Sequence, residues 1–191
     1  MRKDLYIISG CNGAGKTTAS YTVLPEILDC KEFVNADEIA RGLSPFNPES
    51  VAIEAGRLML QRIDELLQRN ETFSIETTLS TKTYIHLVRR AQAKGYHVSI
   101  LFFWLSTPEL AIERVAERVQ NGGHNIPEDI IRRRYFAGIN NLFQLFIKEV
   151  DYWDIYDNSD SPRKQIARGG KDTKTIIFQE KIFSQIKNYV R

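Results

Sequence analysis

A glycine-rich segment, residues 10–17, constrains the fold of this sequence more than any other feature, because it fits the pattern G-x-x-x-x-G-K-[ST]. An apolar run at residues 5–8 precedes it, and residues 18–24 lead on from it. A strand, a tight loop and a helix are therefore predicted. In that setting backbone N–H groups surround phosphate oxygens, and the positive end of the helix dipole points at the same anion.

This loop is predicted to hold the phosphates of a nucleoside triphosphate, either ATP or GTP. The Lys16 ammonium should reach the β- and γ-phosphates, and the Thr17 hydroxyl should join the shell of a bound Mg²⁺. A chance glycine-rich turn would have to match both the motif and the strand-to-helix setting. The expected nucleotide contacts are Gly10, Cys11, Asn12, Gly13, Ala14, Gly15, Lys16, Thr17 and Thr18.

Length, charge and cysteine content exclude several classes of protein. The chain has 191 residues, 42% of them hydrophobic, which predicts one soluble domain over residues 1–191. A formal net charge of +2 is too small to favour a nucleic-acid partner. Cys11 and Cys30 form neither a disulfide framework nor a metal site. The N-terminal apolar stretch is too short for a signal sequence or a membrane span, so we expect a cytoplasmic protein without a membrane contact.

Short apolar runs alternate along the chain with longer stretches of helical period. This alternation is typical of βαβ units, and it predicts an α/β fold with a mostly parallel sheet. The run at residues 98–105 is apolar throughout, which places it in or beside the centre of the sheet. Strands are predicted at residues 4–9, 32–36, 72–76, 98–105 and 154–157, with a short edge pairing at 175–178.

Helix boundaries follow from capping residues and helix breakers. Asn47 followed by Pro48 predicts a helix start, and Ser80 or Thr81 is expected to cap a helix that ends at Gly95. The predicted helices after the first one cover about residues 48–68, 81–94, 108–119 and 128–149, and a C-terminal helix begins at about residue 179.

The segment of about residues 114–134, called the lid below, is predicted to close over the phosphates. Gly122 and Gly123 lie between two helices that carry arginines, and such a hinge allows closing and reopening. Helical arginines are usually solvated, but at least one is needed at the γ-phosphate, and Arg118 is the best placed. His124 fits a phosphate donor and a solvent-exposed loop residue equally well.

Two carboxylates follow predicted strands and are candidates for the chemistry. The carboxyl ends of parallel strands line one crevice, so Asp37 and Glu76 should face the phosphate loop. Asp37 is the candidate base, although it also suits a cap for the turn at residues 38–41. The usual magnesium aspartate is missing, because the run of residues 100–105 ends in serine and threonine, so Asp37 and Glu76 would hold the waters of the metal.

With these residues in place, the chain resembles the zeta-toxin family of P-loop kinases. The resemblance rests on residues 10–18, 35–37 and 75–78, on the pair 117–118 before the glycines, and on Pro127. It covers roughly residues 4–158. It implies a three-layer α/β/α P-loop fold with a five-stranded sheet in the order 2-3-1-4-5 and a helical lid. It also implies transfer of the γ-phosphate of ATP or GTP to a hydroxyl. In the best-known members the acceptor is UDP-N-acetylglucosamine.

The resemblance also assigns roles by position. Asp37 matches the catalytic base of the family, Glu76 and Thr78 its acceptor contacts, and Lys16 and Arg118 its phosphate contacts. The family places a second arginine three residues before the proline, where this chain has His124, so Arg132 or Arg133 would supply that charge. Asn158 follows the last strand, where related kinases hold the base, and is expected to contact adenine.

The acceptor wall is predicted at residues 47–70, where Arg57 would meet an anionic group of the acceptor or stay solvated. Three function classes follow from the residues. One is a small-molecule kinase of the zeta type, for which toxicity and an antitoxin partner stay open. The second is a polynucleotide 5′-hydroxyl kinase, which the weak net charge disfavours. The third is a nucleotide-binding regulatory module without transfer.

Overall fold

In the computed structural model, residues 2–26, 28–123 and 125–190 are described. In these ranges, seven strands form one sheet in the order β2-β3-β1-β4-β5-β6-β7. The strands are β1 (Lys3–Ser9), β2 (Glu32–Val34), β3 (Phe73–Thr77), β4 (Tyr96–Trp104), β5 (Tyr152–Asp157), β6 (Lys164–Gly170) and β7 (Thr173–Ile177).

The first five strands pair in parallel and have the predicted order 2-3-1-4-5. The predicted number of strands is wrong, because β6 and β7 extend the sheet with antiparallel pairs. The edge pairing expected at residues 175–178 corresponds to β7. Strand β6 was missed because its residues, Lys164–Gly170, include two charged residues and two glycines and lack an apolar alternation.

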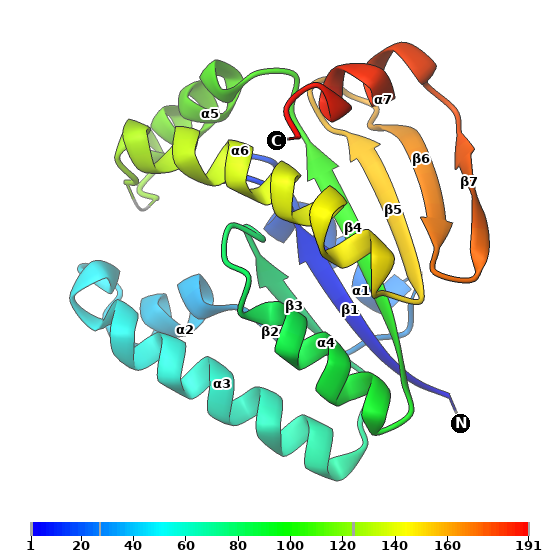
Figure 1. Cartoon of the computed structure of the whole chain (residues 1–191). Coiled ribbons are helices and arrows are strands. Elements are labelled where there is room, and N and C mark those ends of the chain that lie inside the picture. Colours follow the sequence, from blue (N-terminus) through cyan, green and yellow to red (C-terminus); the bar gives the residue numbers. More distant parts are fainter. Residues whose placement is uncertain (1, 27, 124, 191) are drawn as a thin grey trace.

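Helices cover both faces of the sheet and form a three-layer α/β/α arrangement. Helices α4 and α6 lie in front of the sheet and α1 lies behind it (Figure 1). The helices are α1 (Lys16–Glu26), α2 (Ala36–Leu43), α3 (Ala52–Arg69), α4 (Tyr84–Ala93), α5 (Pro108–Gln120), α6 (Glu128–Gln144) and α7 (Glu180–Lys187). Short 3₁₀ turns at Pro48–Val51 and Phe146–Lys148 adjoin α3 and α6.

Two helix starts differ from their predictions. Thr83, and neither Ser80 nor Thr81, precedes α4, because the residues after β3 first run through a loop in which Leu79 has a positive φ. The helix predicted from Pro48 begins as a 3₁₀ turn, and Asn47 gives it no side-chain cap. Helix α2 directly follows β2 and was not predicted.

The central strands form the core of the molecule. Strand β4 is buried over Val98–Trp104, as an unbroken apolar run predicts. Helix α6 packs its apolar stripe on this core, and Tyr135, Ile139, Leu142 and the following Phe146 are buried, as expected for core packing. In the described ranges, none of the helices has the length and apolarity of a membrane span.

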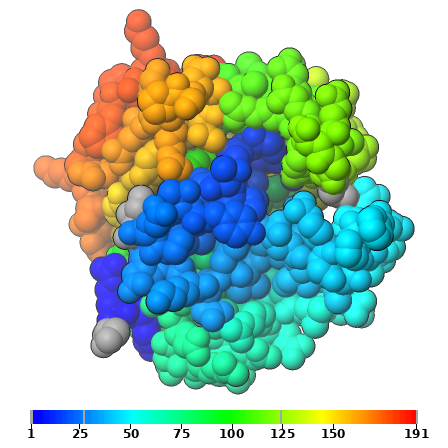
Figure 2. Space-filling view, turned by 180° about the vertical axis from the view of Figure 1, so that it is seen from behind, coloured from blue at the N-terminus to red at the C-terminus, as the bar shows by residue number. Residues whose placement is uncertain are grey.

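Figure 2 shows the molecule from behind, with α1 and the phosphate loop in blue near its middle. The surface is hollowed where the phosphate loop, the cyan segment of α2 and α3, and the green end of α5 approach one another. The carboxyl ends of the parallel strands therefore open into one crevice, as the doubly wound arrangement requires.

Candidate active site

The phosphate loop connects β1 to α1 through backbone conformations that only glycine adopts readily. Gly10 has a φ of +139°, and a Cβ atom there would lie 2.2 Å from the carbonyl oxygen of Phe103. Gly15 has a φ of +74°, and a Cβ atom would meet Nδ2 of Asn158 at 2.7 Å. The loop is thus pressed against β4 on one side and against the segment after β5 on the other.

Lys16 begins α1 and is buried, with 6% of its surface exposed. Its Nζ donates a hydrogen bond of 2.9 Å to the carbonyl oxygen of Cys11 and lies 3.7 Å from Oε1 of Glu76. Burial raises the pKa of the Cys11 thiol to about 11, so this thiol stays neutral at pH 7. The Lys16 side chain is thus held inside the curve of the loop backbone, beside the carboxylate of Glu76.

Glu76 lies near the end of β3 and faces the loop, as predicted from the strand order. Its carboxylate accepts hydrogen bonds from the Thr17 hydroxyl, at 2.8 Å to Oε2 and 3.1 Å to Oε1. Burial raises the pKa of Glu76, and the charge of Lys16 opposes that shift. Thr17 and Glu76 together offer oxygen atoms, which are the ligands that Mg²⁺ prefers. Among the described residues, no group of three or more acidic, histidine or cysteine side chains forms a complete metal site by itself.

Asp37 lies in the first turn of α2, and its carboxylate is not the cap of that helix. Asn35 takes this role, because its Oδ1 accepts a 2.8 Å hydrogen bond from the backbone N–H of Asp37. The alternative reading of Asp37 as a cap is therefore wrong. Its carboxylate is exposed on the wall of a cavity of about 530 Å³.

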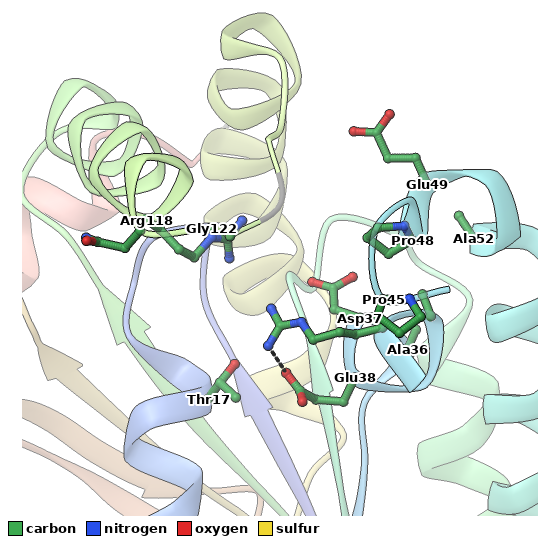
Figure 3. Close-up of a pocket in the computed structure, with 14 residues that line it drawn as sticks. Thr17, Ala36, Asp37, Glu38, Pro45, Pro48, Glu49, Ala52, Arg118 and Gly122 are labelled. Atoms are coloured by element: carbon green, nitrogen blue, oxygen red, sulfur yellow. Dashed lines mark ion pairs between the residues drawn. The ribbon is translucent and has the colours of Figure 1, made fainter. Parts of the chain in front are cut away.

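The lid and α2 form opposite walls of this cavity (Figure 3). On one wall Asp37 points into the open space, and Glu38 and Arg41 form an ion pair of 3.4 Å beside it. On the other wall lies Arg118 with the two glycines that follow it. The lining residues are Thr17, Ala36, Asp37, Glu38, Ala40, Arg41, Pro45, Pro48, Glu49, Ala52, Arg118, Asn121, Gly122 and Gly123.

The arginines at the start of α6 do not point as predicted, since neither Arg132 nor Arg133 contacts the phosphate loop in the described ranges. Arg132 forms an ion pair with Glu109 at the start of α5, on the molecular surface, and not with the phosphate loop. Arg133 is exposed. Arg134 is instead the one that reaches the loop, where its Nη1 donates a 3.2 Å hydrogen bond to Oδ1 of Asn12. His124, the other predicted lid contact, lies outside the described residues.

A shallow hollow of about 500 Å³ lies on the far side of the phosphate loop. Asn158 lines it and donates a 2.8 Å hydrogen bond from Nδ2 to the carbonyl oxygen of Ala14. Arg114 fixes the same segment through the carbonyl oxygens of Asn158 and Ser159, at 2.8 and 2.6 Å. The Asn158 amide therefore supports the loop, and its contact with a nucleotide base stays a prediction.

Two predicted acceptor contacts do not line the cavity beside Asp37. Thr78 shares a hydrogen bond of 2.8 Å with Ser80 in the loop after β3. Arg57 is exposed on α3 and lines a separate hollow of about 550 Å³ between α3 and α4. Arg41 on α2, in contrast, lines the cavity beside Asp37. The sequence did not point to it, because helix α2 was not expected.

Arg134 was not one of the two predicted phosphate contacts, Arg132 and Arg133, and the sequence left open which of the three consecutive arginines faces the phosphates. It lies three residues after Ile131 and four before Gly138, both buried, so it flanks the inward face of α6 and is half-buried. Arg132 flanks the same face on its other side, because it lies three residues before Tyr135 and seven before Ile139, which are both buried. Helical periodicity therefore sets Arg133 apart, but it does not decide between Arg132 and Arg134.

A family model described as Zeta toxin matches residues 1–163 of this chain. The chain belongs to the zeta-toxin family. An uncharacterized protein of Haemophilus influenzae is 29% identical to it over 142 residues, which cover 71% of this chain and 99% of that protein.

Two solved structures show the same fold at low sequence identity. AvrRxo1-ORF1:-ORF2 with ATP has a TM-score of 0.77 at 15% identity, and the match covers 97% of this chain and 63% of that one. The PezAT chromosomal toxin-antitoxin system of Streptococcus pneumoniae has a TM-score of 0.66 at 18% identity, over 98% of this chain and 86% of that one. This chain thus spans less than two thirds of the length of the AvrRxo1 chain.

Proposed function

We propose that this chain is a kinase that transfers the γ-phosphate of ATP or GTP to a hydroxyl of a small molecule. The observation that carries the proposal is the carboxylate of Asp37, which the Asn35 cap leaves exposed on a cavity shared with Thr17 and Arg118. A base, a phosphate loop and a lid arginine around one open space are the parts that phosphoryl transfer requires.

In the proposed reaction Asp37 accepts the proton of the acceptor hydroxyl as that oxygen bonds to the γ-phosphorus. The bond from the γ-phosphorus to the β,γ-bridging oxygen breaks, and the nucleoside diphosphate leaves with those electrons. Lys16 and Arg118 balance the negative charge on the phosphate oxygens during this exchange. Each side chain used in these reaction steps lies on the phosphate loop or on the walls of the cavity.

Magnesium would be held by the Thr17 hydroxyl and the phosphates, with Asp37 and Glu76 binding its waters. The oxygen atoms at this position, with Glu76 in direct contact with Thr17, suit a hard cation. When bound, the metal would neutralise charge on the β- and γ-phosphates.

A nucleotide sugar such as UDP-N-acetylglucosamine is the acceptor that family membership favours. Arg41 supports an anionic acceptor, because it stands on the cavity wall near Asp37. The AvrRxo1 and PezAT structures are complexes or systems of two components, so a protein partner of the antitoxin type is also proposed for this chain.

The direct test incubates the full chain with γ-labelled ATP, Mg²⁺ and a panel of nucleotide sugars, sugars, nucleosides and oligonucleotides. Asp37→Asn and Lys16→Ala serve as controls. We expect label on a small hydroxyl acceptor, with transfer by Asp37→Asn reduced about 100- to 10,000-fold while its nucleotide affinity is kept.

Label on oligonucleotide 5′-hydroxyls alone would establish a polynucleotide kinase instead. Binding of ATP without transfer to any acceptor would establish a regulatory module. Undiminished transfer by Asp37→Asn would show that Asp37 is not the base.

A further inference from the structure

Arg134 brings a second guanidinium to the phosphate loop from α6. It is half-buried, and its Nη1 is 3.2 Å from Oδ1 of Asn12, which is itself only 6% exposed. Asn12 is the third residue of the loop, beside the glycines that surround the phosphates. A bound triphosphate would thus lie next to this guanidinium.

The helix that carries Arg134 is fixed to the core at three places. The Tyr135 hydroxyl donates a 2.7 Å hydrogen bond to the carbonyl oxygen of Leu105, and Nδ2 of Asn141 donates one of 2.9 Å to Leu79. Gly138 packs so closely that a Cβ atom there would lie 2.6 Å from the carbonyl oxygen of Thr78. Helix α6 is therefore held against the ends of β3 and β4, and Arg134 keeps its position relative to the loop.

Arg118 is placed very differently. It lies in the last turn of α5, and the next residues run into Gly122 and Gly123, where the chain can bend. The predicted closure of the segment around Gly122 and Gly123 would change the distance of Arg118 to the phosphates, whereas the core contacts of α6 hold Arg134 in place.

The charges around Arg134 also fit a phosphate contact. Its surroundings include the carboxylate of Asp37, which favours its charged form, and the guanidinium of Arg133, which opposes it. Burial lowers the pKa of Arg134, yet a guanidinium stays charged at pH 7. The hydrogen bond that Arg134 makes to the neutral amide oxygen of Asn12 uses one of the five guanidinium donors, and the fork geometry of the others suits an anion.

We propose that Arg134 is a catalytic residue that contacts the γ-phosphoryl group and supplies a fixed positive charge during transfer. This role rests on the proposed kinase function. It gives the chain a second phosphate arginine, at the end of the predicted lid segment where α6 is already held by the core, in addition to Arg118 on α5. Preorganised charge of this kind stabilises the transition state because it needs no rearrangement at the moment of reaction.

A purely structural role would have different consequences. If Arg134 only supported the loop through Asn12, its removal would weaken ADP and ATP binding alike and lower the melting temperature. If it contacts the γ-phosphate, its removal changes the response to the third phosphate and leaves ADP binding unchanged, because ADP has no γ-phosphate.

The experiment compares Arg134→Ala, Arg134→Lys and the wild type. For each we would measure kcat, the KM for ATP, the melting temperature, and Kd for ADP and for a non-hydrolysable ATP analogue. Arg89→Ala is the matched control, because Arg89 is an exposed arginine on helix α4 whose guanidinium pairs with Glu149 and not with the phosphate loop. We expect kcat to fall about 1000-fold in Arg134→Ala, the scale of an arginine finger, with partial recovery in Arg134→Lys. We also expect the ADP affinity to stay within about twofold.

Arg132→Ala separates this inference from the alternative placement of the charge. A loss of kcat in Arg132→Ala equal to or greater than that in Arg134→Ala would overturn the assignment, as would equal losses of ADP and ATP-analogue affinity in Arg134→Ala. The binding measurements need no acceptor. If the wild type transfers phosphate to no acceptor, the kinase proposal fails, but a loss of analogue affinity confined to Arg134→Ala still supports the γ-phosphate contact.

Discussion

The two walls of the site are built in different ways. The phosphate wall consists of a contiguous loop whose important groups are buried, since Asn12 and Lys16 are each only 6% exposed. The wall proposed to bind the acceptor consists of α2 and the 3₁₀ turn after it, and we call it the acceptor wall. Most of its lining residues are exposed, and Phe46 at its outer end is fully exposed.

This difference assigns nucleotide binding and acceptor binding, the two parts of the proposed reaction, to walls with different tolerance to substitution. Close packing at Gly10 and Lys16 means that the phosphate wall tolerates few substitutions. It does not need to vary, because the triphosphate group is the same in every nucleoside triphosphate. The acceptor wall has few core contacts, so its side chains can be replaced at low cost to stability. Donor binding should therefore respond to substitutions in the loop, and acceptor choice to substitutions in α2.

The largest effect is expected at the phosphate wall with Gly10→Ala. The new Cβ atom would lie 2.2 Å from the carbonyl oxygen of Phe103, and the backbone has a φ of +139° that alanine rarely adopts. We expect a loss of more than about 3 kcal/mol in the free energy of unfolding, with loss of nucleotide binding.

Denaturant unfolding and nucleotide titration measure both quantities. Gly42→Ala is the control, because the residue is helical and, among the described residues, no heavy atom beyond its chain neighbours and its own helix backbone lies within 4 Å of its Cβ position. It should be neutral or stabilising by up to about 1 kcal/mol. Equal stability of the two variants would break the claim that the phosphate wall is rigid.

A smaller effect is expected at the acceptor wall with Asn35→Ala. Its side chain caps α2 through the N–H of Asp37, so its removal should cost about 1 kcal/mol in unfolding free energy. The start of α2 should fray, and transfer should fall more than nucleotide affinity because Asp37 loses its fixed position. Asn35→Asp keeps the capping oxygen and should retain most of the stability. A larger loss of nucleotide affinity than of transfer rate in Asn35→Ala would contradict the separation of the two walls.

Glu76→Gln tests the carboxylate that lies between the walls. Burial raises the pKa of Glu76 from its ordinary value of 4.5. The folded state thus binds this proton more tightly than the unfolded state, so stability falls as the pH rises through the ordinary pKa towards the raised one. The glutamine variant avoids this loss, and its melting temperature at pH 7.5 should exceed that of the wild type.

The gain should shrink as the pH falls below 4.5, which a series of melting curves would measure. Magnesium-dependent transfer should decrease in the same variant, because the proposed metal position loses a charge. A wild type that is more stable than the variant at pH 7.5 would show that the pairing of Glu76 with Lys16 outweighs its burial.

The smallest effect is expected for Arg57→Ala. Its side chain lies in the hollow between α3 and α4 and does not line the cavity beside Asp37. The KM for the acceptor should change by no more than about twofold. Steady-state kinetics with the identified acceptor measures it, and Arg41→Ala, which does line the cavity, should give the larger increase. The reverse order would move the acceptor wall from α2 to α3.

The sequence was most informative where a function depends on adjacent residues. The phosphate loop forms through local backbone geometry, so its motif predicted the strand, the loop and the helix together. Alternating apolar runs likewise predicted the five parallel strands, and family resemblance gave their order. The short helix α2 and strand β6 were missed, because neither has the length or the apolar period that distinguishes an element from a loop.

The tertiary structure decided which of the candidate side chains from distant parts of the sequence meet at the phosphate loop. The sequence identified Asp37 and Glu76 as facing the loop, since the ends of parallel strands must meet at one edge of the sheet. It did not determine which of three consecutive arginines reaches the phosphates. That choice depends on the rotation of α6, which the contacts of Tyr135, Gly138 and Asn141 with the loops after β3 and β4 fix in place.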